Sequence, residues 1–140
     1  MTRRERTEIL IRGKRELAVR LATEIEEKYG AQKIEAANEG LVMVKMREPA
    51  KRTLFYLGEV TVTEAKVAVH GKIGMGLVVG KDEELAYNLA VIDAAYQAEL
   101  PETNAWREML LAEQVAVGIE DKREMGRIMK TKVDFSNMQI

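Results

Sequence analysis

The sequence predicts a single α+β domain with an N-terminal helix, an antiparallel sheet of about four strands and two or more C-terminal helices. Apolar residues recur at helical spacing near both ends of the chain. The middle of the chain alternates apolar and polar residues with a period of two, which is typical of strands. A length of 140 residues is enough for one hydrophobic core without disulfides or metals.

The first helix is expected over residues 5–29. Leu17, Leu21 and Ile25 recur every four residues and define its apolar face. Gly30 is a suitable stop. Many basic residues lie near its start, but acidic residues dilute them and no recognition motif accompanies them, so a solvated helix face is expected.

Two strand-like runs follow, on either side of Asn38-Glu39-Gly40, and these three residues favour a hairpin turn. The second run, LVMVKM, is apolar at both odd and even positions. Such a strand is covered on both faces, either by helices of its own chain or by a partner. A further strand is expected within residues 54–69.

The stretch GKIGMGLVVGKD at 71–82 begins after a tight turn at His70-Gly71. Within it, one side of a strand carries Ile73, Met75, Leu77 and Val79, and the other side carries Gly74, Gly76 and Gly80. Glycines on one side let another backbone approach closely. Asp82 is a natural N-cap for the next helix, which runs to about Leu100 before Pro101 interrupts it.

A second C-terminal helix is expected from about Thr103. Residues 105–119 are apolar almost all round, so this helix must be buried, and in so small a chain this indicates a subunit interface. In the tail 133–140 the apolar positions are too irregular for a helical stripe, which favours an extended peptide docked on a partner. The predicted interface residues are Trp106, Met109, Leu110, Val117, Val133, Phe135 and Met138.

Composition excludes several classes of site. The chain has no cysteine, so it cannot itself ligate an iron–sulfur cluster or form a disulfide. A net charge of −1 gives no overall attraction to nucleic acid. No signal-peptide segment or membrane-length apolar run is recognised, and the expected location is the cytoplasm.

The glycine-rich stretch does not match a phosphate-binding loop. A P-loop needs a hydroxyl residue after Gly-Lys, but Asp82 follows Gly80-Lys81, and Met75 stands where the first glycine should be. A carboxylate at the helix N-terminus would also occupy the place of an anion. Contact of Lys81 with a phosphate stays open as an alternative, because lysine beside a helix N-terminus is a recurring device.

No catalytic constellation or metal site is expected. His70 is the only histidine, and histidine before glycine in a tight turn is best explained by its tolerance of positive φ. Asp93 and Glu99 do not share one helical stripe, so both are expected to be solvated or capping carboxylates. His70, Lys81 and Asp82 remain the candidates for contact with a phosphate or another substrate.

Several stretches together resemble the PhnG subunit family of the bacterial carbon–phosphorus lyase core complex. They are GLVMVKMRE, LGEVTVTEAKV, the glycine-rich strand, LAVIDAAYQ and the closing KVDFSNM. The resemblance runs from about Arg4 to Met138. The order and spacing of these stretches along the chain make it specific. The chain departs from the family at Met75, where histidine or a large polar residue is common.

The resemblance implies a single PhnG-like domain over 1–140 and a small, non-catalytic role in phosphonate catabolism. Its implied partners are PhnH, PhnI and PhnJ subunits, with a homodimer contact inside the complex. The complex would transfer an alkylphosphonate to the ribose C1 of ATP and release adenine. The iron–sulfur cluster and S-adenosylmethionine would belong to a partner subunit.

Two alternatives from other classes remain at this point. One is a free-standing small enzyme that uses His70 with Asp82 or Lys81. The other is a regulatory or nucleic-acid-binding domain that uses the basic N-terminal helix.

Overall fold

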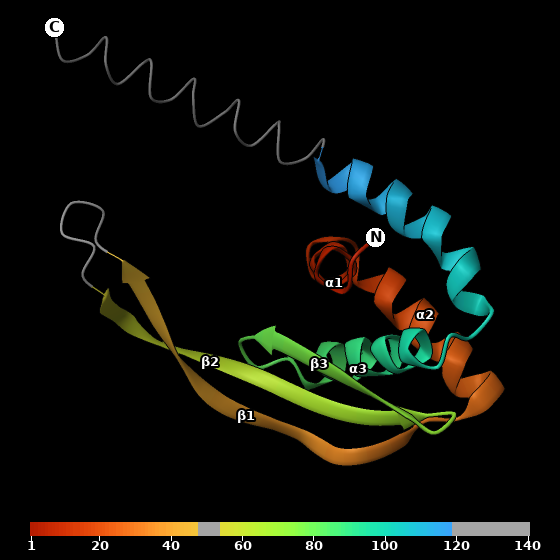
Figure 1. The fold of residues 1–140 in the computed structure, drawn as a ribbon, viewed down its shortest axis with the longest axis horizontal. Helices are drawn as coiled ribbons and strands as arrows, with labels where there is room; N and C mark the ends of the chain where they lie inside the picture. Colours follow the sequence, from red (N-terminus) through yellow and green to blue (C-terminus); the bar gives the residue numbers. More distant parts are fainter. Residues whose placement is uncertain (48–53, 119–140) are drawn as a thin grey trace, which may run out of the picture.

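The computed structural model describes residues 1–47 and 54–118, in which a three-stranded antiparallel sheet carries helices on one face only (Figure 1). The strand order is β1-β2-β3, so β3 is an edge strand. The predicted α+β class is confirmed, with helices before and after the sheet. In Figure 1 the opposite face of the sheet carries no helix, and β1 and β2 extend beyond β3.

The N-terminal helical region forms two helices, α1 (Arg3–Arg12) and α2 (Arg15–Tyr29), instead of the single helix expected over 5–29. The chain is extended at Gly13. A Cβ there would lie 2.6 Å from Cγ of Glu113, whose Oε1 accepts the Lys14 N–H at 3.0 Å. A distant side chain therefore occupies the break, and this could not be predicted from local helix propensity.

The long strands β1 (Gln32–Arg47) and β2 (Leu54–Val69) pair with each other from Gln32↔Ala68 to Arg47↔Leu54. The hairpin expected at residues 38–40 does not form, and the described sheet therefore has three strands where about four were expected. Asn38 instead pairs with Glu64, next to a register shift. Pairing with β2 satisfies the backbone here, and the turn-favouring residues are accommodated as an irregularity of a continuous strand.

The connection into β3 (Lys72–Val79) is the predicted tight turn. His70 and Gly71 have φ values of 50° and 78°, in the left-handed region. After β3, Asp82 caps α3 (Glu83–Gln97) by accepting the Leu85 N–H at 3.2 Å, as expected. A fourth helix follows over 102–118, close to its predicted start, and Figure 1 shows it arching over α1 and α2.

The core lies between the sheet and α3, and it extends to α2 and the 102–118 helix. Gly74 and Gly76 place β3 against the backbone of α3. A Cβ on Gly76 would lie 1.9 Å from the Ala86 carbonyl oxygen, and a Cβ on Gly74 would lie 2.1 Å from the Ala94 nitrogen. The largest side chains that are fully buried include Trp106, Leu21, Ile25, Ile92 and Leu110.

We expect Gly76→Ala to lower the free energy of unfolding by about 3 kcal/mol, because the added methyl group meets helix backbone that cannot move independently. Gly40→Ala is the matched control: Gly40 is also in a strand, but its nearest neighbour to a built Cβ is Val62 at 4.0 Å. Urea denaturation of both variants checks this. Equal midpoints for the two variants would show that the close approach is not required.

Candidate functional site

The glycine-rich stretch forms the last strand and the capped start of α3, and Asp82 is fully engaged there. Arg15 donates two hydrogen bonds to its carboxylate, each of 2.7 Å. This bonding to Arg15 holds the pKa of Asp82 below its usual value. Thr63 Oγ1 donates to the Gly80 carbonyl at 2.6 Å and accepts the Asp82 N–H at 3.2 Å. These contacts fix the strand–helix connection, and they leave Asp82 a structural role.

His70 and Lys81 lie at opposite ends of the eight-residue strand β3, roughly 25 Å apart at the usual rise per residue. The exposed Lys81 ammonium pairs with Glu39 at 3.8 Å. The His70 ring packs edge-on against Tyr29, with 5.8 Å between ring centroids. The three candidate substrate contacts therefore do not converge, and no joint chemistry of His70 with Lys81 or Asp82 is supported.

The predicted interface residues of the fourth helix fall into different environments. Trp106 and Leu110 are fully buried in this chain's own core, which corrects the expectation that they face a partner. Met109 is partly buried against that core. The helix packs over α2 and α3 through Trp106, whereas Leu111 and Val115 remain 41% and 63% exposed. Val133, Phe135 and Met138 lie outside the described residues.

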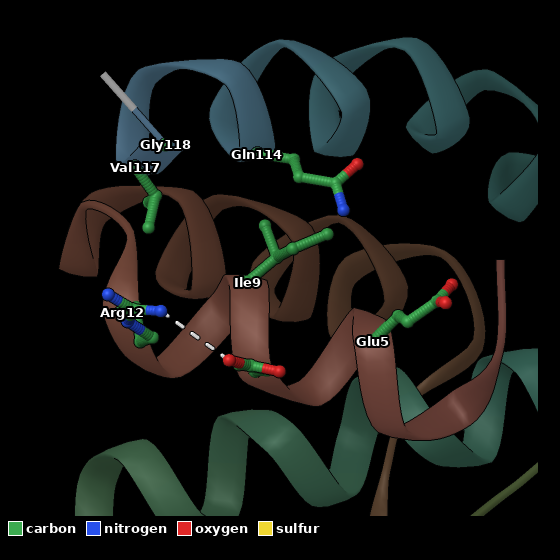
Figure 2. A pocket seen from close by; sticks show the side chains of 7 residues that line it. Glu5, Ile9, Arg12, Gln114, Val117 and Gly118 are labelled. Carbon is green, nitrogen blue, oxygen red and sulfur yellow. Dashed lines mark hydrogen bonds and ion pairs between the residues drawn. The ribbon is translucent and has the colours of Figure 1, made fainter. Parts of the chain in front are cut away.

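Val117 lines a small cavity between α1 and the fourth helix, together with Ile9, Gln114 and Gly118 (Figure 2). The cavity has a volume of about 180 Å³. On the α1 side, Arg12 pairs with Glu8 at 3.5 Å. This volume is below the range of ordinary ligand pockets, so the cavity is a seam between two helices rather than a binding site.

The open face of β3 carries four of its five large apolar side chains, and the covered face carries Gly74, Gly76 and Val78. Ile73, Met75, Leu77 and Val79 are 56%, 44%, 51% and 75% exposed, whereas Gly74 and Gly76 are buried. A sheet with one solvated face normally places polar residues there and large apolar residues on the core. In β3 this arrangement is inverted, and the residues share faces as the sequence alternation predicted.

The apolar surface of this face continues at Val42 of β1, which is 46% exposed and pairs with Val60, whereas Leu41 and Met43, 66% and 53% exposed, point to the other side of the strand. These residues belong to the strand that was expected to be covered on both faces. Within the described parts of the chain, no helix covers them (Figure 1). Val42, Ile73, Met75, Leu77 and Val79 form what we call the open-face patch. An exposed apolar surface of this kind marks an interaction site.

A buried charged cluster lies on the covered side and was missed by the sequence analysis. Asp93, only 5% exposed, accepts hydrogen bonds from Arg3 and Arg6 on α1. Its Oδ2 also accepts the Met75 N–H at 2.9 Å, which occupies one donor on β3. The expectation of a solvated Asp93 and a wholly solvated basic helix face is therefore wrong. The sequence did contain a signal for this cluster: Asp93 stands inside the apolar run AVIDAA. A carboxylate buried in such a run needs a cationic partner.

Aromatic rings extend this cluster through the protein. The Arg6 guanidinium stacks on Tyr96, 3.7 Å from the ring centroid, and burial lowers the pKa of Arg6. Tyr96 meets Trp106 edge-on with 5.8 Å between centroids, and the indole N–H donates to Glu24 at 3.1 Å. This row connects α1, α3, the fourth helix and α2.

Among residues 1–47 and 54–118, no group of three or more histidine or acidic side chains is arranged to hold a metal ion. None of the helices in these ranges is long and apolar enough to cross a membrane.

We expect Asp82→Ala to lower the free energy of unfolding by about 1 kcal/mol through loss of the helix cap. Asp82→Asn should lower the free energy of unfolding by less, because asparagine keeps the helix cap and removes only the charge. The pKa of Asp82 is lower in the folded state, so its charge stabilises the fold above about pH 3.9. That contribution is lost as the pH falls through the folded-state pKa. The free energies of unfolding of the parent and of the Asn variant, measured between pH 7 and pH 2, should therefore converge at low pH. A difference that stays constant over this range would contradict this role of Asp82.

Asp93→Ala should lower the free energy of unfolding by about 3 kcal/mol or more, because it leaves Arg6 buried without its counter-charge and the Met75 N–H without its acceptor. Glu8→Ala removes an exposed partner of Arg12 and should change stability by less than about 1 kcal/mol. Chemical denaturation compares the two, and similar losses would mean that the buried cluster is not a stabilising centre.

Comparisons with known proteins show the family of this chain. The sequence model of the family described as "Phosphonate metabolism protein PhnG" matches residues 1–139. A curated relative from Rhizobium meliloti (strain 1021) is 32% identical over 117 residues, covering 81% of this chain and 73% of the relative. That relative is the alpha-D-ribose 1-methylphosphonate 5-triphosphate synthase subunit PhnG. The chain thus belongs to the PhnG family of phosphonate metabolism proteins.

Proposed function

We propose that this chain is a non-catalytic subunit that organises partner subunits of a phosphonate-activating complex through its open-face patch. The reaction would transfer an alkylphosphonate to the ribose C1 of ATP with release of adenine. Support comes from the family match and from the curated relative, which is named as a subunit of such a synthase. The described site residues also support a binding role, since the candidate reactive groups do not converge.

The inverted strand β3 carries this proposal. Its glycines contribute almost no side-chain surface to the chain's own core, while four of its five large apolar residues face solvent and only Val78 is buried. Full burial of an exposed side chain of this kind is worth about 1.5–3 kcal/mol, and roughly half of that remains to be gained here because the four side chains are about half exposed. A partner that covers the patch would therefore release a large hydrophobic free energy. The twisted, apolar face suits another protein surface better than a small ligand.

The proposed partners are the PhnH, PhnI and PhnJ subunits, with a PhnI-type subunit on the patch. A homodimer contact within the complex is also part of the proposal. The lack of cysteine in this chain supports assigning the iron–sulfur cluster and S-adenosylmethionine to another subunit. The proposed location is the cytoplasm.

A nucleic-acid-binding role receives less support from the basic residues. Arg3 and Arg6 are held by Asp93, and Arg15 is held by Asp82. Three of the arginines near the N-terminus are therefore engaged by two carboxylates of the protein, which directs them away from a phosphate backbone.

Leu77→Glu tests the proposed interface. The side chain is half exposed and faces away from α3, so the fold should be kept while a charge is placed in the patch. We expect loss of co-purification with the PhnI-type subunit when all subunits are expressed together, because an unpaired charge would be buried at the contact. Val115→Glu, at a 63% exposed position on the fourth helix, is the matched control and should assemble normally.

Circular dichroism of the isolated variants separates misfolding from lost binding. Normal assembly of folded Leu77→Glu would overturn the assignment of the open-face patch. Loss of assembly in Val115→Glu alone would place the interface on the fourth helix instead.

A further inference from the structure

We propose that a cavity beside the Arg3–Asp93–Arg6 cluster binds a small phosphate-bearing anion. The cavity has a volume of about 670 Å³, within the range of ligand pockets. It lies where the start of α1, the end of α3 and the first turns of the fourth helix meet. Its lining residues are Met1, Arg6, Tyr96, Glu99, Thr103, Asn104 and Arg107. This inference does not rest on the proposed function, because it concerns the opposite side of the sheet from the open-face patch.

The balance of charge at the cavity favours an anion. Arg3 and Arg6 share the single carboxylate of Asp93, so this cluster keeps one positive charge in excess. Arg107 adds a second cation, and it forms no ion pair with any residue that the structure describes. Glu99 is the one acidic residue in the lining. The lining itself therefore carries two arginines, Arg6 and Arg107, against the single carboxylate of Glu99.

Arg6 is held in a fixed orientation at the cavity wall. Its guanidinium is stacked on Tyr96 and bonded to Asp93 at 3.2 Å through one nitrogen. A guanidinium has five N–H donors, so several remain for a ligand. Its side chain is only 10% exposed, and burial lowers its pKa, which means that water solvates this cation poorly. A bound anion would compensate Arg6 for that loss of solvation. Because the Arg6 side chain is already held in place, binding would cost little of its rotamer entropy.

The opposite wall supplies a second set of donors. Asn104 and Arg107 are exposed residues three positions apart in the fourth helix, so they lie on the same face. Thr103 is not available as a donor, because its hydroxyl already donates to the Leu100 carbonyl at 2.6 Å. Two guanidinium groups on separate elements, with an amide between them, match the several oxygens of a phosphate or diphosphate. A single carboxylate would engage only one of them well.

Binding should be measured with the full chain at low ionic strength, with inorganic phosphate and pyrophosphate as probes. Calorimetry gives the affinity, and the fluorescence of Trp106, the only tryptophan, reports the site because its ring contacts Tyr96. We expect pyrophosphate to bind more tightly than phosphate. Arg107→Gln, at an exposed position, should weaken binding about 10-fold, and Glu99→Gln should strengthen it.

Lys81→Gln is the matched control, because it removes the same charge at the other candidate anion position. It should leave the affinity unchanged. An equal loss in Lys81→Gln and Arg107→Gln would mean nonspecific attraction, and a loss in Lys81→Gln alone would place the anion at the start of α3. Either result overturns the proposal.

Failure of the parent chain to bind either probe at millimolar concentration would also overturn it. If Arg107→Gln then weakens assembly with the partner subunits, the cavity receives an acidic side chain of a partner instead. The open-face proposal would be unaffected by these outcomes, since it depends on Leu77→Glu.

Discussion

Backbone contact between β3 and α3 is the constraint on which the rest of the structure depends. Gly74 and Gly76 leave no room for a side chain between the strand and the helix, where Ala86, Ala90 and Ala94 present their backbone atoms. The small residues on both elements allow a closer approach than a usual helix–sheet layer. Packing at these glycines comes from backbone and methyl contacts, and four of the five large apolar residues of β3 lie on the other face.

The same contact positions the charged cluster. Because α3 lies so close to β3, Asp93 reaches the Met75 N–H and occupies a donor that an edge strand would otherwise expose. The carboxylate then holds Arg3 and Arg6, which fixes α1 over the end of α3. The open-face patch, the buried ion pairs and the position of the cavity beside Arg6 thereby all depend on the close packing of β3 against α3. The two faces of the sheet consequently differ: the covered face holds the apolar core and the Asp93 ion pairs, and the open face exposes large apolar residues of β3 beside the Lys66–Glu35 ion pair.

The features predicted correctly from sequence are those set by local rules. The alternation from Ile73 to Val79 determined which side chains share a face, and Asp82 was recognised as an N-cap by residue type and position. The turn at His70-Gly71 followed from residues that tolerate positive φ. For the candidate interface, the sequence indicated surplus apolar surface on the strand LVMVKM, and this agrees with the exposed side chains of Leu41, Val42 and Met43, whereas the exposed apolar face of β3 was not predicted.

The features that were missed depend on contacts between distant parts of the chain. Asn38-Glu39-Gly40 favours a turn locally, but pairing with β2 keeps the strand continuous. The break at Gly13 depends on Glu113, and the role of Asp93 depends on arginines about ninety residues earlier. Trp106 and Leu110 were assigned to a partner because no periodicity shows that the fourth helix folds back over α2 and α3. Tertiary contacts decided each of these cases.

Oxidation of Met75 tests most directly whether the open face of the sheet is an interface. Met75 is 44% exposed on that face, whereas Met109 is partly buried on the helical side and serves as an internal reference. Brief peroxide treatment followed by mass spectrometry should convert Met75 to its sulfoxide readily in the free chain. In the assembled complex, Met75 should be strongly protected, while the oxidation of Met109 should change little. Equal oxidation of Met75 in the free chain and in the complex would contradict the central claim that a partner covers this face.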